Sequence, residues 1–547
     1  MNSENAVRHG RQLLIDVVVL VGLCLLLFFS MLGDRPLWDI DEGMHAHTSK
    51  EMVLTGDWVT PTMNGERFYD KPPLFNWLVS LAFLVFGFTE FASRLPAAVL
   101  GTGTVMATYV LGTRMFDRRV GLLGGVILAT SLEFLVMSRV VVHDIALAFT
   151  VTLSLLFFWI AFHDEHRRRA SLFGFYVAAG LAVVAKGPLG LVLVGLVVGP
   201  WLLIRRQMGF LKHMGLWWGA PVFLAVAAPW YVAVMRANAD FGAYFFIQQN
   251  FMNFASAESR HPEAWHFYVP VMLGGFFPWT AFLPVAVINA VRQRAKQDPG
   301  RLLYLGLWSG MPFLFFSVAS SKLPSYVLPI FPALALLVGV FWRDLLVDRE
   351  GRLHRGALAS MAVLAVILAA GVVYGLVFEL ADAQAKYRVE ASVFLLPIAV
   401  LVAGVALTLA LCWKKLHRAC FVSIAAMIVV LILTVNVAVV PAFNTFRSTR
   451  DLGRRLDAVL PEGERLVFHW DLKDSTLFYT PRLGTTLHTT VDVMRHMAQK
   501  RPAHCMVDMD NYERVDPLTW TGTWVVATDG AKIVLANRPT LRDLQQP

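Results

Sequence analysis

The sequence predicts an α-helical polytopic membrane protein of about thirteen transmembrane helices, followed by a small carboxyl-terminal α/β domain. Composition is the first reason: of 547 residues, 56% are hydrophobic and only 16% are charged, so most of the chain is too apolar for a water-solvated surface. Apolar runs also recur, and each approaches the roughly 20 residues that a helix needs to cross about 30 Å of hydrocarbon. Finally, basic residues are concentrated in the short links between these runs.

The first apolar run follows two basic residues, Arg8 and Arg11, and lacks a small-residue cleavage site. It is therefore expected to remain as a span and not to be removed as a signal peptide. The runs that are expected to cross the membrane are 13–32, 95–113, 120–137, 145–162, 171–185, 188–204, 215–235, 268–290, 302–319, 323–341, 357–378, 391–411 and 420–440.

Basic clusters occupy every second link between these runs. Because positive residues are retained on the cytoplasmic side of a membrane, all of these links are expected in the cytoplasm. The net charge of +9 is thus a topology signal and does not indicate a nucleic-acid-binding groove. The segments expected on the opposite, periplasmic side are 33–94, 138–144, 186–187, 236–267 and 441–547.

One apolar run, 74–88, does not fit this alternation. A crossing there would place every later basic link on the wrong side of the membrane. We therefore expect an interfacial or re-entrant helix within the first outer loop. A short, tilted span is the alternative.

The carboxyl-terminal stretch from Pro441 differs in character from the rest of the chain. Short runs typical of strands occur at 464–470, 503–508, 522–528 and 531–536, with helix-like segments at 449–460 and 491–500. The expected division is a transmembrane domain over 1–440 and a periplasmic α/β domain over 441–547.

The first outer loop carries most of the charged residues that could do chemistry. Charged groups beside a bilayer are costly unless they are paired or used. Asp39, Asp41 and Glu42 are candidates for a general base, which must be an ionised carboxylate near an acceptor hydroxyl. Lys71 and Arg67 are candidates for binding a phosphate. An ordinary solvated loop is the alternative interpretation.

Three other outer positions place a cation at the end of a span. Arg139 lies near Asp144, Lys186 ends another run, and Lys322 precedes Tyr326. Each cation alone could be a side chain that reaches out to the interface. Together, on the side of the acidic loop, they predict a cavity for a phosphate-bearing lipid.

The sequence requires no cofactor, although a weak divalent-metal site is possible. Asp70 and His261 are the residues that could form it. The four cysteines have no metal-binding spacing.

Several of these motifs together resemble the GT-C superfamily, and more narrowly its bacterial branch related to protein O-mannosyltransferases and the aminoarabinose transferase of lipid A. The resemblance covers nearly the whole chain. There are two departures: Asp41-Glu42 is followed by Gly43-Met44-His45 where the aminoarabinose transferases have x-Arg-Tyr, and Asp70 stands where they have Glu. The motifs that carry the resemblance are Asp41-Glu42, Gly56-Asp57-Trp58-x-x-Pro61, Tyr69-Asp70-Lys71-Pro72-Pro73-Leu74 and Lys322-Leu323-Pro324-x-Tyr326.

The resemblance implies an inner-membrane glycosyltransferase that works on the periplasmic face. Its donor would be a polyprenyl (undecaprenyl) phosphate sugar, and its acceptor lipid A or another envelope molecule. The leading sugar is 4-amino-4-deoxy-L-arabinose or a related one. Asp41 matches the first-loop acid of this family, Asp144 the second acid, and Lys71 the cation at the donor phosphate. Tyr326 matches the tyrosine of the later motif and is expected to bind substrate, and Tyr69, Asp70 and His261 are further candidates for substrate binding.

The chemistry of such a reaction fits these residues. A sugar phosphate already has a good leaving group, so the enzyme must neutralise the phosphate, align the reactants and remove one proton. Asp41 is the expected base of an inverting transfer, with Glu42 or Asp39 as substitutes. The cations expected at the phosphate are Lys71, Arg67, Arg139 and Lys322.

Two other functions remain open. A protein or glycan O-glycosyltransferase would use the same chemistry with another acceptor. A lipid-linked sugar transporter or flippase would share the span count but not the bond cleavage. Transporters usually show internal repeats and ionisable groups near the bilayer midplane, whereas the ionisable groups here lie at one rim.

Overall fold

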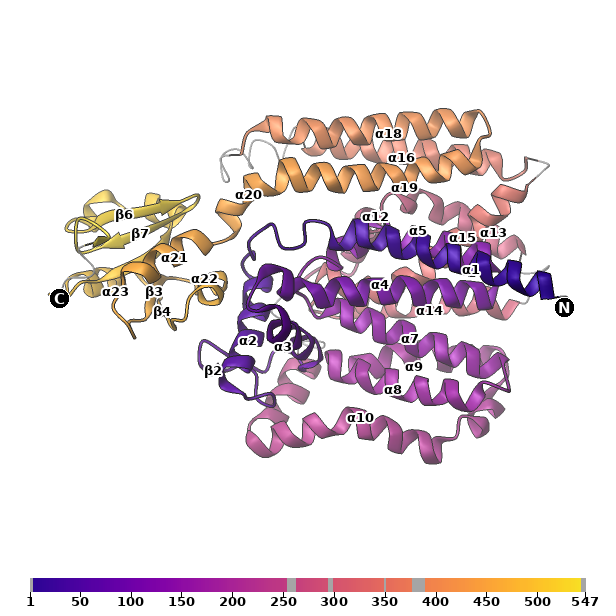
Figure 1. Cartoon of the computed structure of the whole chain (residues 1–547), viewed down its shortest axis with the longest axis horizontal. Helices are drawn as coiled ribbons and strands as arrows, with labels where there is room; N and C mark the ends of the chain where they lie inside the picture. Colours follow the sequence, from indigo (N-terminus) through magenta and orange to yellow (C-terminus); the bar gives the residue numbers. More distant parts are fainter. Residues whose placement is uncertain (1–2, 253–261, 294–298, 349–350, 376–388, 543–547) are drawn as a thin grey trace.

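The computed structural model describes residues 3–252, 262–293, 299–348, 351–375 and 389–542 (Figure 1). Long helices run side by side as a bundle, and a small sheet lies beyond one end of it. The amino terminus lies at the opposite end of the bundle. The helices of the bundle are α1 (Ser3–Cys24), α4 (Glu90–Met115), α5 (Arg118–Ala129), α6 (Leu132–Met137), α7 (Asp144–His163), α8 (Arg168–Lys186), α9 (Leu189–Ile204), α10 (Leu216–Ala237), α12 (Tyr268–Gly275), α13 (Leu283–Gln293), α14 (Pro299–Val318), α15 (Phe331–Val347), α16 (His354–Tyr374), α18 (Leu395–Trp413) and α19 (His417–Thr434).

Each apolar run predicted to cross the membrane coincides with helix in the described residues, but fewer than thirteen are long single spans. Within the described ranges, ten helices are long and apolar enough to cross, or eleven if one bent pair counts as a span. That pair, 268–275 and 279–292, is bent by 106° beside Pro278. The predicted run 120–137 is broken between α5 and α6, and α9 has only 16 residues. The structure therefore supports a polytopic helical membrane protein with ten or eleven candidate spans.

The first outer loop folds into short elements at the end of the bundle near the sheet (Figure 1). Helix α2 spans Asp41–Thr55, and α3 spans Leu74–Phe86, which at 1.5 Å per residue is too short for a bilayer. Between them, β1 (Thr62–Met63) and β2 (Glu66–Arg67) form an antiparallel hairpin. Its turn residues Asn64 and Gly65 both have positive φ, as tight hairpins require.

The carboxyl-terminal unit is a mixed five-stranded sheet with the order β4-β3-β5-β7-β6. β3 (Leu466–His469) pairs in parallel with β4 (Gly484–Leu487) and β5 (His504–Asp508), whereas β7 (Lys532–Ala536) is antiparallel to β5 and β6 (Trp524–Asp529). The predicted small α/β unit is confirmed, and β4 is an additional strand. Its helices, with the one that leads into it, are α20 (Val440–Arg447), α21 (Arg450–Val459), α22 (Asp474–Tyr479), α23 (Thr490–Met497) and α24 (Met509–Glu513).

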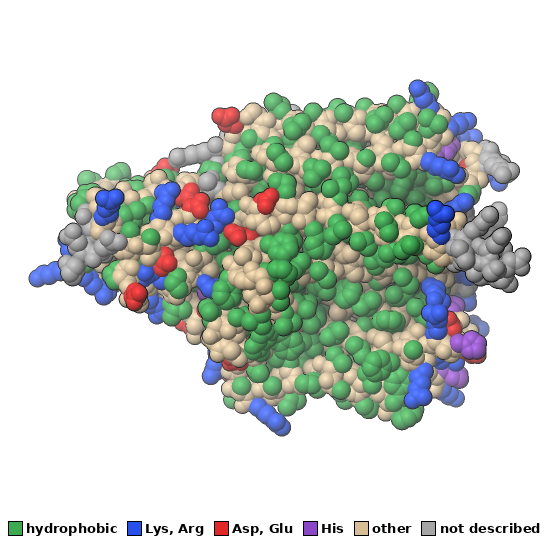
Figure 2. Space-filling view, in the orientation of Figure 1, with side chains coloured by type: hydrophobic (Ala, Val, Ile, Leu, Met, Phe, Trp, Pro, Cys, Tyr) green, Lys and Arg blue, Asp and Glu red, His purple; other side chains and the backbone are tan. Residues whose placement is uncertain are grey.

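Charge is distributed unevenly over the visible face of the molecule (Figure 2). The flank of the helix bundle is mostly hydrophobic, as lipid contact requires. Lysines and arginines gather at the end of the bundle that carries the amino terminus, and both signs of charge appear around the sheet. This asymmetry matches the predicted alternation of basic links.

Candidate active site

The carboxyl-terminal unit holds the start of α2. The backbone N–H and hydroxyl of Ser475 donate to the carboxylate of Asp39, at 2.7 and 2.8 Å. The ammonium of Lys50 donates to the carbonyls of Phe478 and Thr480, at 2.7 and 2.8 Å. A Cβ added to Gly43 would lie 2.5 Å from the Ser475 nitrogen, so only glycine allows this approach. The start of helix α2 and its residue Lys50 are therefore both held against the sheet unit.

Glu42 is the most tightly bound of the predicted acids. Arg35 and Arg94 each donate two hydrogen bonds to its carboxylate, at 2.8–3.0 Å. Burial acts to raise the pKa of Glu42, but the two guanidinium groups outweigh it and hold that pKa at about 2. Both oxygens are thus engaged in a permanent ion-pair network. This arrangement favours an architectural role over that of a proton acceptor.

Asp41, by contrast, is the exposed first residue of α2. It interacts electrostatically with Tyr326 and with Asp474. Of the three acids in the predicted base group, Asp39 is held by Ser475 and Glu42 by arginines. Asp41 is exposed, and its electrostatic interaction with Tyr326 supports the base role that the sequence predicts for it.

A second group of polar residues gathers where three helical segments meet. The Lys186 ammonium, at the end of α8, forms an ion pair with Asp144 at the start of α7. The Ser325 hydroxyl donates to the other Asp144 oxygen at 2.8 Å, and the Lys186 nitrogen lies 3.9 Å from the centre of the Tyr326 ring. Asp144 and Tyr326, which the sequence predicts in one site, are thus brought together by Lys186.

Lys71 and Asp70 connect this group to the first loop. Lys71 pairs with Asp70 at 2.8 Å, and both side chains are only partly exposed. Lys71 also acts electrostatically on Asp144 and Lys186. Two cations and two carboxylates therefore share this region, each cation paired with one carboxylate.

Two buried histidines complete the group, and sequence reasoning missed both. His45 follows Asp41 by one helical turn, and its ring centre lies 4.4 Å from that of His143. Burial, together with the charge of Lys71, lowers the pKa of His45 to about 4 and that of His143 well below its usual range. The four-residue spacing between Asp41 and His45 was the available signal, because such residues share one helix face.

The structure gives two of the predicted phosphate-binding cations other partners. The Arg139 guanidinium donates to the carbonyls of Leu27 and Ser30, at 2.5 and 2.7 Å. The Lys322 ammonium donates to the carbonyls of Ala319 and Glu263, at 2.5 and 2.7 Å. Both side chains thereby fix backbone segments around the site.

The remaining predicted residues lie at the margin of the group or outside the described structure. The Arg67 side chain is 58% exposed and lies 3.5 Å from Asp240. Tyr69 packs with its ring edge-on to Phe241. His261 lies outside the described residues, so the possible metal site with Asp70 stays a prediction. Elsewhere in the described part of the chain, no group of three or more possible metal ligands occurs.

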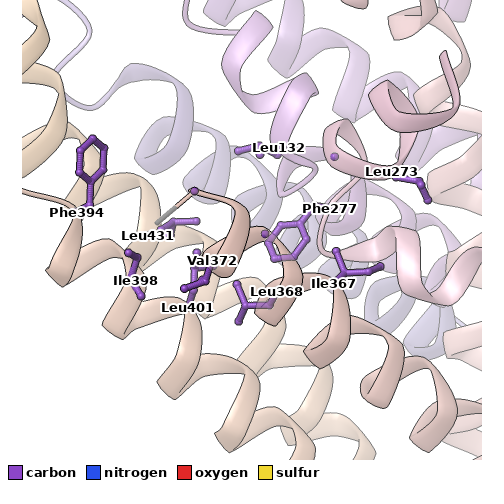
Figure 3. A pocket seen from close by; sticks show the side chains of 13 residues that line it. Leu132, Leu273, Phe277, Ile367, Leu368, Val372, Phe394, Ile398, Leu401 and Leu431 are labelled. Carbon is purple, nitrogen blue, oxygen red and sulfur yellow. The ribbon is translucent and has the colours of Figure 1, made fainter. Parts of the chain in front are cut away.

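An apolar cavity of about 490 Å³ opens between helices α6 and α12 on one side and helices α16, α18 and α19 on the other (Figure 3). Leu132 and Phe277 line it from one side, and side chains of α16, α18 and α19 from the other. Leu132 belongs to α6, whose next residue, Glu133, interacts electrostatically with Asp144. Hydrocarbon chains are the ligands that such a lining favours.

Comparison with known proteins decides the family. Residues 70–232 match the family described as dolichyl-phosphate-mannose-protein mannosyltransferase. The undecaprenyl phosphate-α-4-amino-4-deoxy-L-arabinose arabinosyl transferase of Erwinia tasmaniensis is 30% identical over 391 residues, which cover 68% of this chain and 69% of that protein. A Pseudomonas fluorescens protein described as the same transferase (number 2) is 32% identical, over 66% of this chain and 65% of its own length. The chain belongs to the ArnT-related family of GT-C membrane glycosyltransferases.

Solved structures agree with this assignment. ArnT from Cupriavidus metallidurans, bound to undecaprenyl phosphate, superposes with a TM-score of 0.79 at 25% identity and covers 96% of this chain and 98% of its own. The archaeal oligosaccharyltransferase AglB from Archaeoglobus fulgidus shares the fold, with a TM-score of 0.56 at 12% identity over 96% of this chain and 74% of its own. The resemblance predicted from the sequence motifs is therefore confirmed. The ArnT-related chain is a glycosyltransferase that uses a polyprenyl-phosphate sugar.

Proposed function

We propose that this enzyme transfers 4-amino-4-deoxy-L-arabinose from undecaprenyl phosphate to lipid A at the periplasmic face of the bacterial inner membrane. The observation that carries the proposal is 30% identity to an arabinosyl transferase of this donor across more than two thirds of both chains. A superposition of nearly the whole chain on ArnT supports it. The apolar cavity beside α6 is consistent with a substrate that has a long hydrocarbon chain.

The proposed mechanism assigns each reacting group to one residue. Asp41 accepts the proton of the acceptor hydroxyl, whose oxygen attacks the anomeric carbon. The bond from that carbon to the phosphate oxygen breaks, and its electron pair leaves with undecaprenyl phosphate. Lys71 and Lys186 stabilise the phosphate charge, while Asp144 and Ser325 hold Lys186 in place. Attack from the face opposite the phosphate inverts the anomeric centre.

The matching family model favours a second candidate function, in which the acceptor is a protein. Its description names a protein mannosyltransferase, and the matched residues 70–232 include Lys71, Asp144 and Lys186. A protein hydroxyl could therefore replace lipid A as the acceptor, with the same donor chemistry. Mass spectrometry of lipid A and envelope proteins from cells with and without the enzyme distinguishes the two acceptors.

We expect Lys71→Ala to weaken donor binding and transfer together by roughly ten- to a hundredfold, because it removes a charge-assisted contact to phosphate. The assay uses purified enzyme, an undecaprenyl-phosphate sugar and lipid A, and follows release of undecaprenyl phosphate together with glycosylated product. Lys212→Ala is the matched control, since Lys212 is an exposed lysine in the basic link after α9. Movement of the intact donor between leaflets of proteoliposomes, without bond cleavage, would instead establish a flippase.

We also propose thirteen crossings, with α5–α6, α9 and the bent α12–α13 pair completing the ten long helices. The proposed domains are 1–440 in the membrane and 441–547 in the periplasm. Cysteines introduced at Glu66 and Glu462 should react with an impermeant reagent added outside spheroplasts, and one at Arg167 should not. All three positions are exposed, and the four native cysteines are buried, which limits background labelling. Labelling of position 167 alone would reverse the proposed orientation.

A further inference from the structure

The buried histidines have hydrogen-bonding capacity that the described part of the protein does not use. His45 is 6% exposed and His143 is 3% exposed. Nδ1 of His45 and both ring nitrogens of His143 have no hydrogen-bond partner among the described residues. Phe75 closes one side of His143, at 5.2 Å between ring centres. A buried polar atom without a partner costs free energy, so these nitrogens are suited to meeting a ligand.

The position of the pair indicates which part of a ligand it would meet. His45 lies one turn after Asp41 on α2, and His143 directly precedes Asp144. Lys71 acts electrostatically on both imidazoles. The pair is therefore flanked by the proposed base and by the proposed phosphate-binding cation. In a displacement at the anomeric carbon, the sugar occupies the space between the attacking hydroxyl and the departing phosphate.

The charge state of the pair also fits a sugar better than a phosphate. Burial and the neighbouring lysines lower the pKa values of both rings, so both are neutral at pH 7. A neutral imidazole offers one N–H donor and one acceptor nitrogen, which matches a hydroxyl group that both donates and accepts. A phosphate needs cations, and Lys71 and Lys186 supply them.

We propose that His45 and His143 bind hydroxyl groups of the transferred sugar and so select the donor by its sugar. The inference rests on the proposed transfer from undecaprenyl phosphate. It adds two specificity-determining residues to that reaction. One of them, His45, occupies a position where the resembling motif of the aminoarabinose transferases has tyrosine.

The test separates sugar recognition from phosphate recognition. With purified enzyme, KM and kcat are measured for the sugar-bearing donor, and the inhibition constant is measured for undecaprenyl phosphate without a sugar. His45→Phe and His143→Phe keep a ring but remove its nitrogens. We expect each to lower kcat/KM by roughly tenfold or more while the inhibition constant changes less than about twofold. His45→Gln and His143→Gln, which restore a donor and an acceptor, should recover part of the loss.

The exposed His266 provides the matched control, because His266→Phe should change neither constant. Thermal midpoints of all variants identify any that do not fold. If a phenylalanine variant does not fold, the corresponding glutamine variant is compared with the wild-type enzyme instead. An equal loss of affinity for both lipids would show that the pair binds phosphate, and unchanged constants in folded variants would show a purely structural role. Either result overturns the proposal. Absence of turnover by the wild-type enzyme with every donor would instead refute the proposed function itself.

Discussion

Asp41→Asn is expected to reduce transfer by about 10²–10⁴-fold while the enzyme remains folded, because an amide keeps the shape of the carboxylate but cannot accept the acceptor's proton. The side chain is exposed at the start of α2, and asparagine has nearly the same volume as aspartate, so the fold should tolerate the replacement. Single-turnover rates with saturating donor measure the effect on the chemical step, separately from product release.

Asp240→Asn is the matched control for this substitution. Asp240 is also an exposed carboxylate, with 64% of its side chain accessible and a 3.5 Å contact to Arg67. It should retain near wild-type turnover. If Asp41→Asn also retains it, Asp41 is not the base, and the acid held by Ser475, Asp39, becomes the next candidate.

Arg94→Leu is expected to destabilise the protein by about 3–5 kcal/mol, because it removes one partner of a buried charge pair. Arg94 is fully buried, bonds both oxygens of Glu42 and also donates to the carbonyls of Leu32, Arg35 and Pro36. Its loss leaves these acceptors without their donor. The thermal midpoint in detergent should fall strongly, and transfer should fall with it, since Glu42 anchors the first turn of α2.

The contrast with a surface arginine gives this prediction its control. Arg67→Leu breaks an exposed 3.5 Å contact with Asp240, and such pairs contribute about 0–1 kcal/mol. It should leave the midpoint nearly unchanged. Similar midpoints for the two variants would mean that the network around Glu42 is not a main support of the first loop.

The positions of the helices could be predicted from sequence because hydropathy and the positive-inside bias are local and repeated signals. The break between α5 and α6 and the 106° bend between α12 and α13 were not predicted, because mean hydropathy over a long run hides the polar pair Thr130-Ser131 and the helix breaker Pro278. Strand β4 was missed because Gly484–Leu487 is a short segment recognisable only from its parallel pairing with β3.

Residues of the candidate site could be proposed from the sequence where they lie in recognisable motifs. Asp41, Lys71, Asp144 and Tyr326 each belong to a recognisable segment, and the structure places the last three close to Lys186. The partners of Arg139 and Lys322 were not predictable, because these side chains donate to backbone carbonyls. Every residue has a backbone carbonyl, so the sequence does not indicate which one accepts. A lone histidine is equally uninformative until the fold brings His45 and His143 together.

The contacts between the α2 segment and the sheet unit can form only late in biosynthesis. Asp39 and its partner Ser475 are separated by 436 residues, so at about 5–20 residues per second a ribosome needs roughly 20–90 s to make the second after the first. During that interval the α2 segment has been translated without the partners that later hold Asp39 and Lys50. We expect chains released before Ser475 to lack these contacts.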